Sequence, residues 1–465
     1  MKLLSYKSLI ALFTILGISL ISFSQNSFSI PQIDSIIKKE VDNGRSSSIV
    51  VGILNNKDQH FICHGYPFHK SKEKADNKII YEIGSITKIF TTTILADMIV
   101  KGELKLSDPV SKYLPDTVKL SEKNDKIITL KHLATHTSGL PLFPKDFIPK
   151  DPQNPYNDYA ISDIYKFLNN FTLTENIEAG EYSNIGMALL ANILCQVSKS
   201  NYETLLKERI CQPLGMHNTI IMATEEQQER IATPYIVPDK IAKYWNFQAI
   251  EGAGAIKSDL VDMLKFLKAQ LSPGNSSIGK AIKLTQSIQY STSIKNTSIG
   301  LGWFINYQYP DTIIWHNGFT GGFRSFIGFD VNNQIGTVVL SNSTRNINDI
   351  GFHILNQNMK IKEFNEKKVI ELNAYNFVKY EGIYKMETGD TMHIFSKDSK
   401  FYLYAENHGE FEIYPQKGGI FIFDQLPFNL EFEDIVNDRF QTLILNDNSS
   451  NPKAKRIHDY KIQIL

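Results

Sequence analysis

The sequence predicts an α/β (α+β) protein with an antiparallel sheet flanked by helices and an all-α lobe, followed by a small all-β barrel. Three observations support this class. Long apolar-periodic helices recur through most of the chain, short glycine-bounded strands follow one another late in that region, and alternating strand patterns alone fill the tail. We therefore divide the chain into a leader (1–24), a main domain (25–356), a linker (357–371) and a barrel (372–465).

Composition places the protein among globular proteins with small partners. Of 465 residues, 42% are hydrophobic and 11% aromatic, which is ample for two or three cores. Lys and Arg number 49, as do Asp and Glu, so the formal net charge is zero. A chain without net positive charge offers no electrostatic argument for a nucleic acid or an anionic membrane as partner. Small-molecule or peptide substrates are expected instead.

The N-terminus has the features of an export signal. Lys2 and Lys7 precede an apolar run over 9–21, and a small-x-small sequence over 22–24 precedes Gln25. The run is too short to span a membrane, so we predict a cleavable signal peptide over 1–24 and no stable membrane anchor after cleavage. The protein is then secreted or periplasmic. Three cysteines exclude a disulfide scaffold, and pairing of Cys195 with Cys211 is left open.

The main domain begins with a helix over 30–42 and a strand hairpin over 47–54 and 58–65. A long apolar helix is expected within 81–102, with Ser85 and Lys88 in its first turn. Residues 141–176 are rich in Pro, Asp, Asn and Tyr and are expected to be irregular. The remaining predictions are helices over 186–197 and 260–271, strands over 300–304, 313–318, 323–330 and 336–341, and barrel strands over 392–395, 401–404, 411–414, 420–423, 430–433, 442–445 and 461–465.

The helix over 81–102 holds the first candidate for chemistry. Ser85 and Lys88 lie three residues apart in its first turn, where their side chains share a face. An amine can take the proton of a serine hydroxyl if burial lowers its pKa from about 10.4. The Ser-x-x-Lys pattern also occurs at 35/38, 71/74, 277/280 and 450/453. Only Ser85 follows a glycine at the start of a long apolar helix, which would bring its N–H near a developing oxyanion.

Two further elements are candidates because of their position. Tyr182 stands at the corner between the irregular segment and the next helix, where its hydroxyl either faces a cleft or caps the corner. His132 and His136 are four residues apart, but no Glu adjoins His132 and no third ligand follows, so we expect turn-forming and packing roles rather than zinc. A phosphate-binding glycine loop and a Gly-x-Ser-x-Gly elbow are both missing from the sequence.

Three motifs in a fixed order carry a family resemblance: Ser85-Ile86-Thr87-Lys88, Tyr182-Ser183-Asn184 and His316-Asn317-Gly318. Together with the sequences at 132–141, 213–216 and 300–303, they resemble the β-lactamase-related serine hydrolases. That family includes class C β-lactamases, D-alanyl-D-alanine carboxypeptidases and family VIII-type esterases. The similarity covers roughly residues 30–350, and the tail from about residue 372 resembles the lipocalin-like β-domain of some members.

The resemblance implies a β-lactamase/transpeptidase-like fold and a role for each motif residue. Ser85 would be the acylated nucleophile, Lys88 its proton partner and Tyr182 the general acid or base. The resemblance also implies a substrate-binding group made of Asn184, which would bind the substrate amide, His316 and Gly318 on the sheet side of the cleft, and Phe319, whose N–H would join that of Ser85 in the oxyanion hole. It implies no metal and no organic cofactor.

The third motif separates the possible substrates. Class C β-lactamases have Lys-Thr-Gly there, whereas His316-Asn317-Gly318 resembles carboxypeptidases and esterases. With an ordinary pKa near 6.5, His316 would attract anionic substrates weakly and in a pH-dependent way. The sequence therefore predicts an exported acyl-serine hydrolase of D-amino peptides, related amides or esters. The alternatives are a true β-lactamase and a catalytically silent penicillin-binding or scaffold module that recognises targets through its β-tail.

Overall fold

The computed structural model describes residues 29–458, with gaps at 57, 121–126, 145, 174–179, 237–239, 309–310, 362–371, 373, 388, 398–399, 406–408, 417, 424–428 and 447–451. The predicted signal peptide over 1–24 and the predicted strand over 461–465 lie outside the described residues, as does most of the predicted linker over 357–371. The remaining predictions can be compared with the structure.

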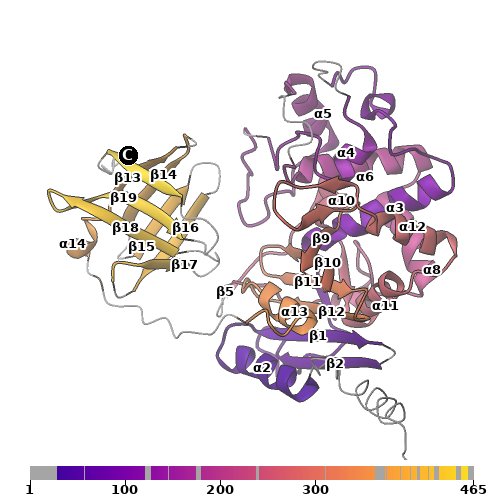
Figure 1. The fold of residues 1–465 in the computed structure, drawn as a ribbon, viewed down its shortest axis with the longest axis horizontal. Helices are drawn as coiled ribbons and strands as arrows, with labels where there is room; N and C mark the ends of the chain where they lie inside the picture. Colours follow the sequence, from indigo (N-terminus) through magenta and orange to yellow (C-terminus); the bar gives the residue numbers. More distant parts are fainter. Residues whose placement is uncertain are drawn as a thin grey trace, which may run out of the picture.

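An eight-stranded antiparallel sheet lies at the centre of the main domain (Figure 1). Its strand order is β2-β1-β12-β11-β10-β9-β8-β7, so that the first strand of the domain pairs with the last. The strands are β1 (Ser48–Asn55), β2 (Asp58–Gly65), β7 (Tyr290–Ser291), β8 (Thr297–Ile299), β9 (Phe304–Gln308), β10 (Asp311–Phe319), β11 (Arg324–Asp330) and β12 (Ile335–Ser341). The β1–β12 pairing therefore requires most of the domain to be in place before the sheet is complete.

Helices cover both faces of this sheet. Residues of α2 (Ile30–Asp42) and α13 (Asn348–Leu355) share one apolar core with Ile49, Val51 and Val339 of the sheet. On the other face, α11 (Leu260–Leu271) contributes to a second, larger core that continues into the helical lobe. Alternate residues of β1 thus enter different cores, as the two-residue period of a strand requires.

The helical lobe surrounds α3 (Thr87–Val100), whose residues from Thr87 to Met98 are all buried. Thr91 and Thr92 donate hydrogen bonds to the carbonyl oxygens of Gly252 and Leu301, so the buried hydroxyls have partners. The other helices here are α4 (Leu130–Ala134), α5 (Ile161–Asn170), α6 (Asn184–Ser198), α7 (Tyr202–Leu206), α8 (Gln212–Leu214), α9 (Glu225–Gln228), α10 (Glu251–Gly254) and α12 (Ser277–Gln286).

The helix predicted within 81–102, with Ser85 and Lys88 in its first turn, is present, but the α-helix α3 begins at Thr87, two residues after Ser85. Ile80–Glu82 forms strand β3, which pairs with β6 (Lys257–Asp259), and a 3₁₀ turn over Gly84–Ile86 precedes α3. Gly84 has a φ of +52°, which breaks the path from strand to helix. Apolar periodicity alone could not place this break, because all of β3 and Thr87–Met98 of α3 are buried.

Two local predictions were wrong. The segment over 141–176 is not irregular throughout, since α5 lies within it and buries Ile164 and Leu168, four residues apart on one face. The strand expected over 300–304 is instead the turn between β8 and β9, in which Gly302 has a φ of +75°. Trp303 in that turn is buried in the larger core, where its ring packs edge-on against Phe329 of β11 at 5.4 Å between centroids.

The tail forms a closed antiparallel barrel, as predicted, and Figure 1 shows it as a separate body. Its core contains only barrel residues, chiefly aromatic ones such as Phe377, Tyr384 and Phe421. The sequence analysis missed β13 and β20. The elements are α14 (Ala374–Phe377), β13 (Gly382–Met386), β14 (Thr391–Lys397), β15 (Lys400–Ala405), β16 (Gly409–Pro415), β17 (Phe421–Phe423), β18 (Asn429–Val436), β19 (Arg439–Asn446) and β20 (Lys453–His458).

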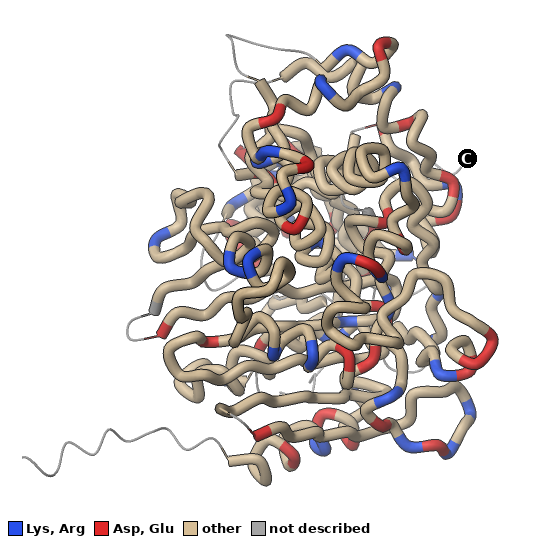
Figure 2. Tube along the Cα trace, turned by 90° about the vertical axis from the view of Figure 1, so that its right-hand side faces the viewer, with Lys and Arg blue, Asp and Glu red and all other residues tan. Residues whose placement is uncertain are grey.

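Charge is dispersed over the described chain. In the view of Figure 2, basic and acidic residues are interspersed along the trace rather than gathered by sign. Within the described part, none of the helices combines the length and apolarity that a membrane span requires.

Because the barrel has a core of its own, the main domain should fold without it. We expect a protein truncated near residue 365 to remain soluble and to keep Ser85 reactive toward a small ester, as measured by size-exclusion chromatography and ester hydrolysis. Aggregation of the truncated protein would show that the barrel covers an apolar face of the main domain.

Candidate active site

Ser85 lies in the 3₁₀ turn between β3 and α3, and its side chain is half-buried. The turn is held from two sides: the N–H of Ile83 donates to the carbonyl of Ile256, and the hydroxyl of Ser325 donates to the carbonyl of Ile83. Ser85 is therefore fixed between the helical lobe and the sheet, with its hydroxyl still accessible.

Lys88 is the second residue of α3 and fully buried, and its Nζ lies 3.0 Å from the Ser85 Oγ. The same amine donates to the carbonyl of Ala253 at 2.8 Å. The structure places no carboxylate in contact with this amine among the described residues. Burial therefore holds the Lys88 pKa well below its usual value, because removal from water destabilises the charged form. A lysine in this state can accept a proton near neutral pH.

Tyr182 stands at the corner before α6, as its sequence position predicts, with Ser183 as the N-cap residue of that helix. Its phenol hydrogen-bonds the side chain of Ser85, and the Lys88 amine lies 4.8 Å from its ring centroid. Burial raises the Tyr182 pKa above its usual value. The phenol is therefore protonated at neutral pH and suited to donate a proton.

Two glycines let the backbone segments that carry Ser85 and Phe319 approach closely. A Cβ on Gly318 would lie 2.0 Å from the Ile83 carbonyl oxygen and 2.8 Å from the Ser85 nitrogen. A Cβ on Gly84 would lie 2.7 Å from the Phe319 nitrogen. The end of β10 and the Ser85 turn can therefore lie side by side only because these positions have no side chain, and an oxyanion hole formed by the two N–H groups stays a prediction.

The two other residues expected near substrate lie beside these groups. Phe319, at the end of β10, is 54% exposed, so its ring is open to the solvent side of the site. The Arg324 guanidinium lies 4.7 Å from the centroid of that ring. Asn184 begins α6, two residues after Tyr182, and is half-buried. Its contact with a substrate amide stays a prediction.

The prediction that His316 titrates near neutral pH was wrong. The side chain is 1% exposed, and burial together with the nearby Lys88 lowers its pKa to about 3. Its Nδ1 lies 2.6 Å from the Asn317 carbonyl oxygen, so Nδ1 carries the proton and Nε2 is a free acceptor. His316 thus stays neutral near pH 7 and cannot produce the expected pH-dependent attraction of anions.

The two histidines of the 132–136 segment stabilise backbone turns. His132 Nδ1 accepts the Thr129 N–H at 3.2 Å in a capping box, and His136 Nδ1 accepts the Ser183 N–H at 3.2 Å. Among the described residues, no three His, Cys, Asp or Glu side chains are grouped so that they could hold a metal ion. Cys195 and Cys211 are free thiols.

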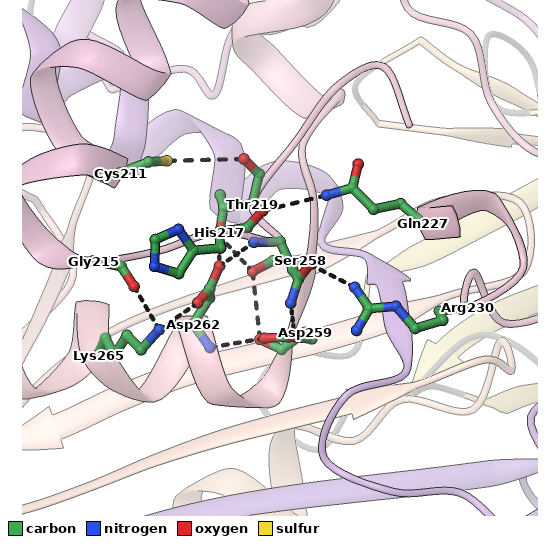
Figure 3. Close-up of polar contacts among 11 residues, drawn as sticks. Cys211, Gly215, His217, Thr219, Gln227, Arg230, Ser258, Asp259, Asp262 and Lys265 are labelled. Atoms are coloured by element: carbon green, nitrogen blue, oxygen red, sulfur yellow. Dashed lines mark hydrogen bonds and ion pairs between the residues drawn. The ribbon is translucent and has the colours of Figure 1, made fainter. Parts of the chain in front are cut away.

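A buried polar network surrounds the end of β6 and the start of α11 (Figure 3). Asp259 caps α11 by accepting the Asp262 N–H, and Asp262 in turn accepts from Thr219 and Lys265. Ser258 pairs with Thr219 at 2.8 Å. Since β6 pairs with β3, just before Ser85, this network fixes the strand from which the nucleophile turn departs.

Sequence analysis missed three residues that contact or adjoin this site. Ala253 supplies the carbonyl for Lys88, and the only signal was the small-residue run over 252–255. His136 packs against Tyr182 with 4.4 Å between ring centroids. Glu82, 2% exposed on β3, accepts the Trp245 N–H at 3.2 Å, and burial raises its pKa. No sequence pattern links residues so far apart along the chain.

A cavity of about 710 Å³ adjoins the Tyr182 corner. Gly139, Phe147, Phe167 of α5 and Glu181 are among its lining residues. Apolar rings and charged side chains both contribute to its walls, which do not include Ser85, Lys88 or Tyr182.

Comparison with known proteins supports one family. A family model described as beta-lactamase matches residues 33–353. A protein named beta-lactamase from Escherichia coli K12 is 27% identical over 370 residues, covering 70% of this chain and 92% of that protein. Protein flp of Staphylococcus aureus MW2 is 27% identical over 325 residues, covering 67% of this chain and 62% of flp.

Two solved structures share the fold. A class C beta lactamase from Rhodobacter sphaeroides superposes with a TM-score of 0.61 at 22% identity, covering 70% of this chain and 98% of that one. An octameric penicillin-binding protein homologue from Pyrococcus abyssi superposes with a TM-score of 0.63 at 22% identity, covering 92% of this chain and all of that one. The second match extends into the barrel.

The depressed pKa of His316 predicts a pH-dependent stability. An unfolded histidine binds a proton below pH 6.5 and the folded one does not, so stability falls as pH falls through 6.5. This histidine accounts for about 2 kcal/mol of the loss between pH 7 and pH 5. We expect His316→Asn to lose correspondingly less in urea unfolding over that interval. An equal loss in both proteins would contradict the buried, neutral state of His316.

Proposed function

Because this chain belongs to the β-lactamase family of serine hydrolases, we propose that it hydrolyses D-amino peptides, related amides or esters through an acyl-enzyme formed on Ser85. The contact between Ser85 and Lys88 carries this proposal. A buried amine with a lowered pKa lies 3.0 Å from a half-buried hydroxyl at the start of a helix. That combination supplies both a nucleophile and the base that activates it.

In the acylation step, the neutral amine of Lys88 takes the proton of the Ser85 hydroxyl while the Ser85 oxygen bonds to the substrate carbonyl carbon. The N–H groups of Ser85 and Phe319 stabilise the oxyanion, which they approach because Gly84 and Gly318 have no side chains. The bond from carbon to the leaving group then breaks, and the leaving group receives a proton from the Tyr182 phenol. The proton held by Lys88 restores that phenol.

In the deacylation step, water forms the new bond to the acyl carbon and the bond to the Ser85 oxygen breaks. One proton of the water moves through Tyr182 and Lys88 and returns to the Ser85 oxygen, so the enzyme is restored. The hydrogen bond between Tyr182 and Ser85 and the position of the Lys88 amine over the tyrosine ring support this route. Lost general acid–base help is typically worth about 10²–10⁴-fold in rate.

The uncharged state of His316 bears on the charge of the substrate. A neutral His316 puts no cation at the third motif, so uncharged esters and amides are favoured over substrates that need a cation for their carboxylate. A true β-lactamase activity is the second candidate, because the E. coli relative that matches 70% of this chain is named beta-lactamase. The location that we propose, secreted or periplasmic, rests on the sequence of residues 1–24.

We expect Ser85→Ala to lower ester turnover by roughly 10³-fold or more while leaving the fold intact, since it removes one oxygen atom and no core volume. The chain offers a matched control in Ser35→Ala, which alters a second Ser-x-x-Lys pattern on the exposed face of α2 and should leave turnover unchanged. A fluorophosphonate should add its mass to the Ser85 peptide alone. Labelling elsewhere, or none, would favour a catalytically silent module.

A panel of three substrates tests the choice among activities. We expect measurable hydrolysis of a short-chain nitrophenyl ester or a D-Ala-D-Ala peptide, and slow or absent hydrolysis of a chromogenic cephalosporin, because His316 supplies no cation. The values of kcat/KM should be compared at pH 7 with the Ser85→Ala protein as the blank. Cephalosporin turnover faster than ester turnover would establish the β-lactamase alternative instead.

A further inference from the structure

His136 takes no part in the proposed acylation and deacylation steps. It lies at the end of the 132–136 segment and is 3% exposed. Its ring packs on that of Tyr182, with 4.4 Å between centroids and 35° between planes. Among the described residues, the other ring contacts of Tyr182 are longer: its centroid lies 6.4 Å from that of His316 and 6.5 Å from that of Phe304. His136 is therefore the ring packed closest against the tyrosine.

A second contact ties His136 to the backbone next to Tyr182. Its Nδ1 accepts the N–H of Ser183, at the corner where α6 begins. A nitrogen that accepts must carry no proton, so the neutral ring holds its proton on Nε2. One imidazole thus fixes both the position of the corner and the ring plane of the residue before it.

The backbone of His136 has a φ of +58°, in the left-handed region that few residues with a Cβ adopt, although Asn, Asp and His do so more often than the others. Asn or Gly would meet the turn requirement equally well or better, so the turn alone does not select an imidazole. What an imidazole adds at this position is the ring contact with Tyr182.

The electrostatic surroundings keep the ring neutral. Lys88 and His316 are the titratable groups that act on it, Tyr182 and Ser183 contact it directly, and burial is the largest cause of its lowered pKa. Its Nε2–H is buried without a partner, as is the Nε2 of His316, so a donor and an acceptor remain unused close to Tyr182. A charged imidazole there would repel a proton arriving on Lys88.

We propose that His136 is a positioning residue for Tyr182, holding the phenol in the orientation from which it exchanges protons with the leaving group and with water. This inference rests on the proposed function, because it assigns His136 an effect that passes only through Tyr182. It predicts a loss of kcat, since proton transfer depends steeply on geometry, with little change in KM.

The test uses His136→Asn in the full chain. Asparagine tolerates a positive φ and can still accept the Ser183 N–H, but it removes the ring that packs on Tyr182. We expect kcat for a nitrophenyl ester to fall about 10–100-fold, KM to change by less than about twofold, and the melting temperature to shift by only a few degrees. His132→Asn is the matched control, since His132 also accepts a backbone N–H through Nδ1 in the same segment.

A double-mutant cycle decides whether the effect passes through Tyr182. In a protein that already has Tyr182→Phe, adding His136→Asn should cause no further loss of kcat. Equal activity of wild type and His136→Asn, or full additivity with Tyr182→Phe, would overturn the inference. Should the Asn variant fail to fold, His136→Gln enters the same cycle and is judged by the same two outcomes.

Measurements on the wild-type protein distinguish a failure of the proposed function from a failure of the role proposed for His136. If it neither hydrolyses the ester nor takes up a fluorophosphonate on Ser85, the proposed function fails. If it does both while the cycle shows additivity, only the role of His136 fails.

Discussion

The burial of one uncharged amine is the constraint on which the rest of this structure depends. Lys88 lies in a helix buried on all sides and close to Ser85, and its nitrogen donates to the carbonyl of Ala253. A buried ammonium without a carboxylate partner would be strongly destabilised, so the amine gives up its charge instead. The α10 segment, the β3–β6 pairing and the polar network around Asp259 all fix the surroundings that make this possible.

The same constraint extends to the groups around the amine. His136 and His316 both have lowered pKa values, chiefly because burial disfavours their charged forms. The pKa of the Tyr182 phenol is raised instead, so the phenol keeps its proton at neutral pH. The site therefore contains four titratable side chains and is close to neutral as a whole. Protons can move among them without creating an isolated charge in a medium of low dielectric constant.

Much of the fold could be predicted from the sequence, because a helix or strand that is buried on one side has apolar residues at a regular spacing. The helix over 30–42, the hairpin strand over 58–65 and the helix over 260–271 were predicted with the bounds that the structure gives. The 3₁₀ turn that precedes α3 was not predicted, because it depends on a positive φ at Gly84. The grouping of Ser85, Lys88 and Tyr182, which the structure brings together, could be predicted from motif order. The neutral state of His316 could not be predicted, because its burial arises only when distant segments pack together.

The contacts missed by sequence share one property: each joins segments far apart along the chain through a backbone atom. Ala253 holds Lys88 by a carbonyl, and His136 holds the Tyr182 corner through the Ser183 N–H. A backbone partner leaves no residue-type signature, so a single sequence cannot reveal it. Because β1 pairs with β12, the sheet wall of the site closes only when the ends of the domain meet. The geometry around Ser85 is therefore a property of the completed domain, and variants that loosen this closure should lower reactivity before they abolish folding.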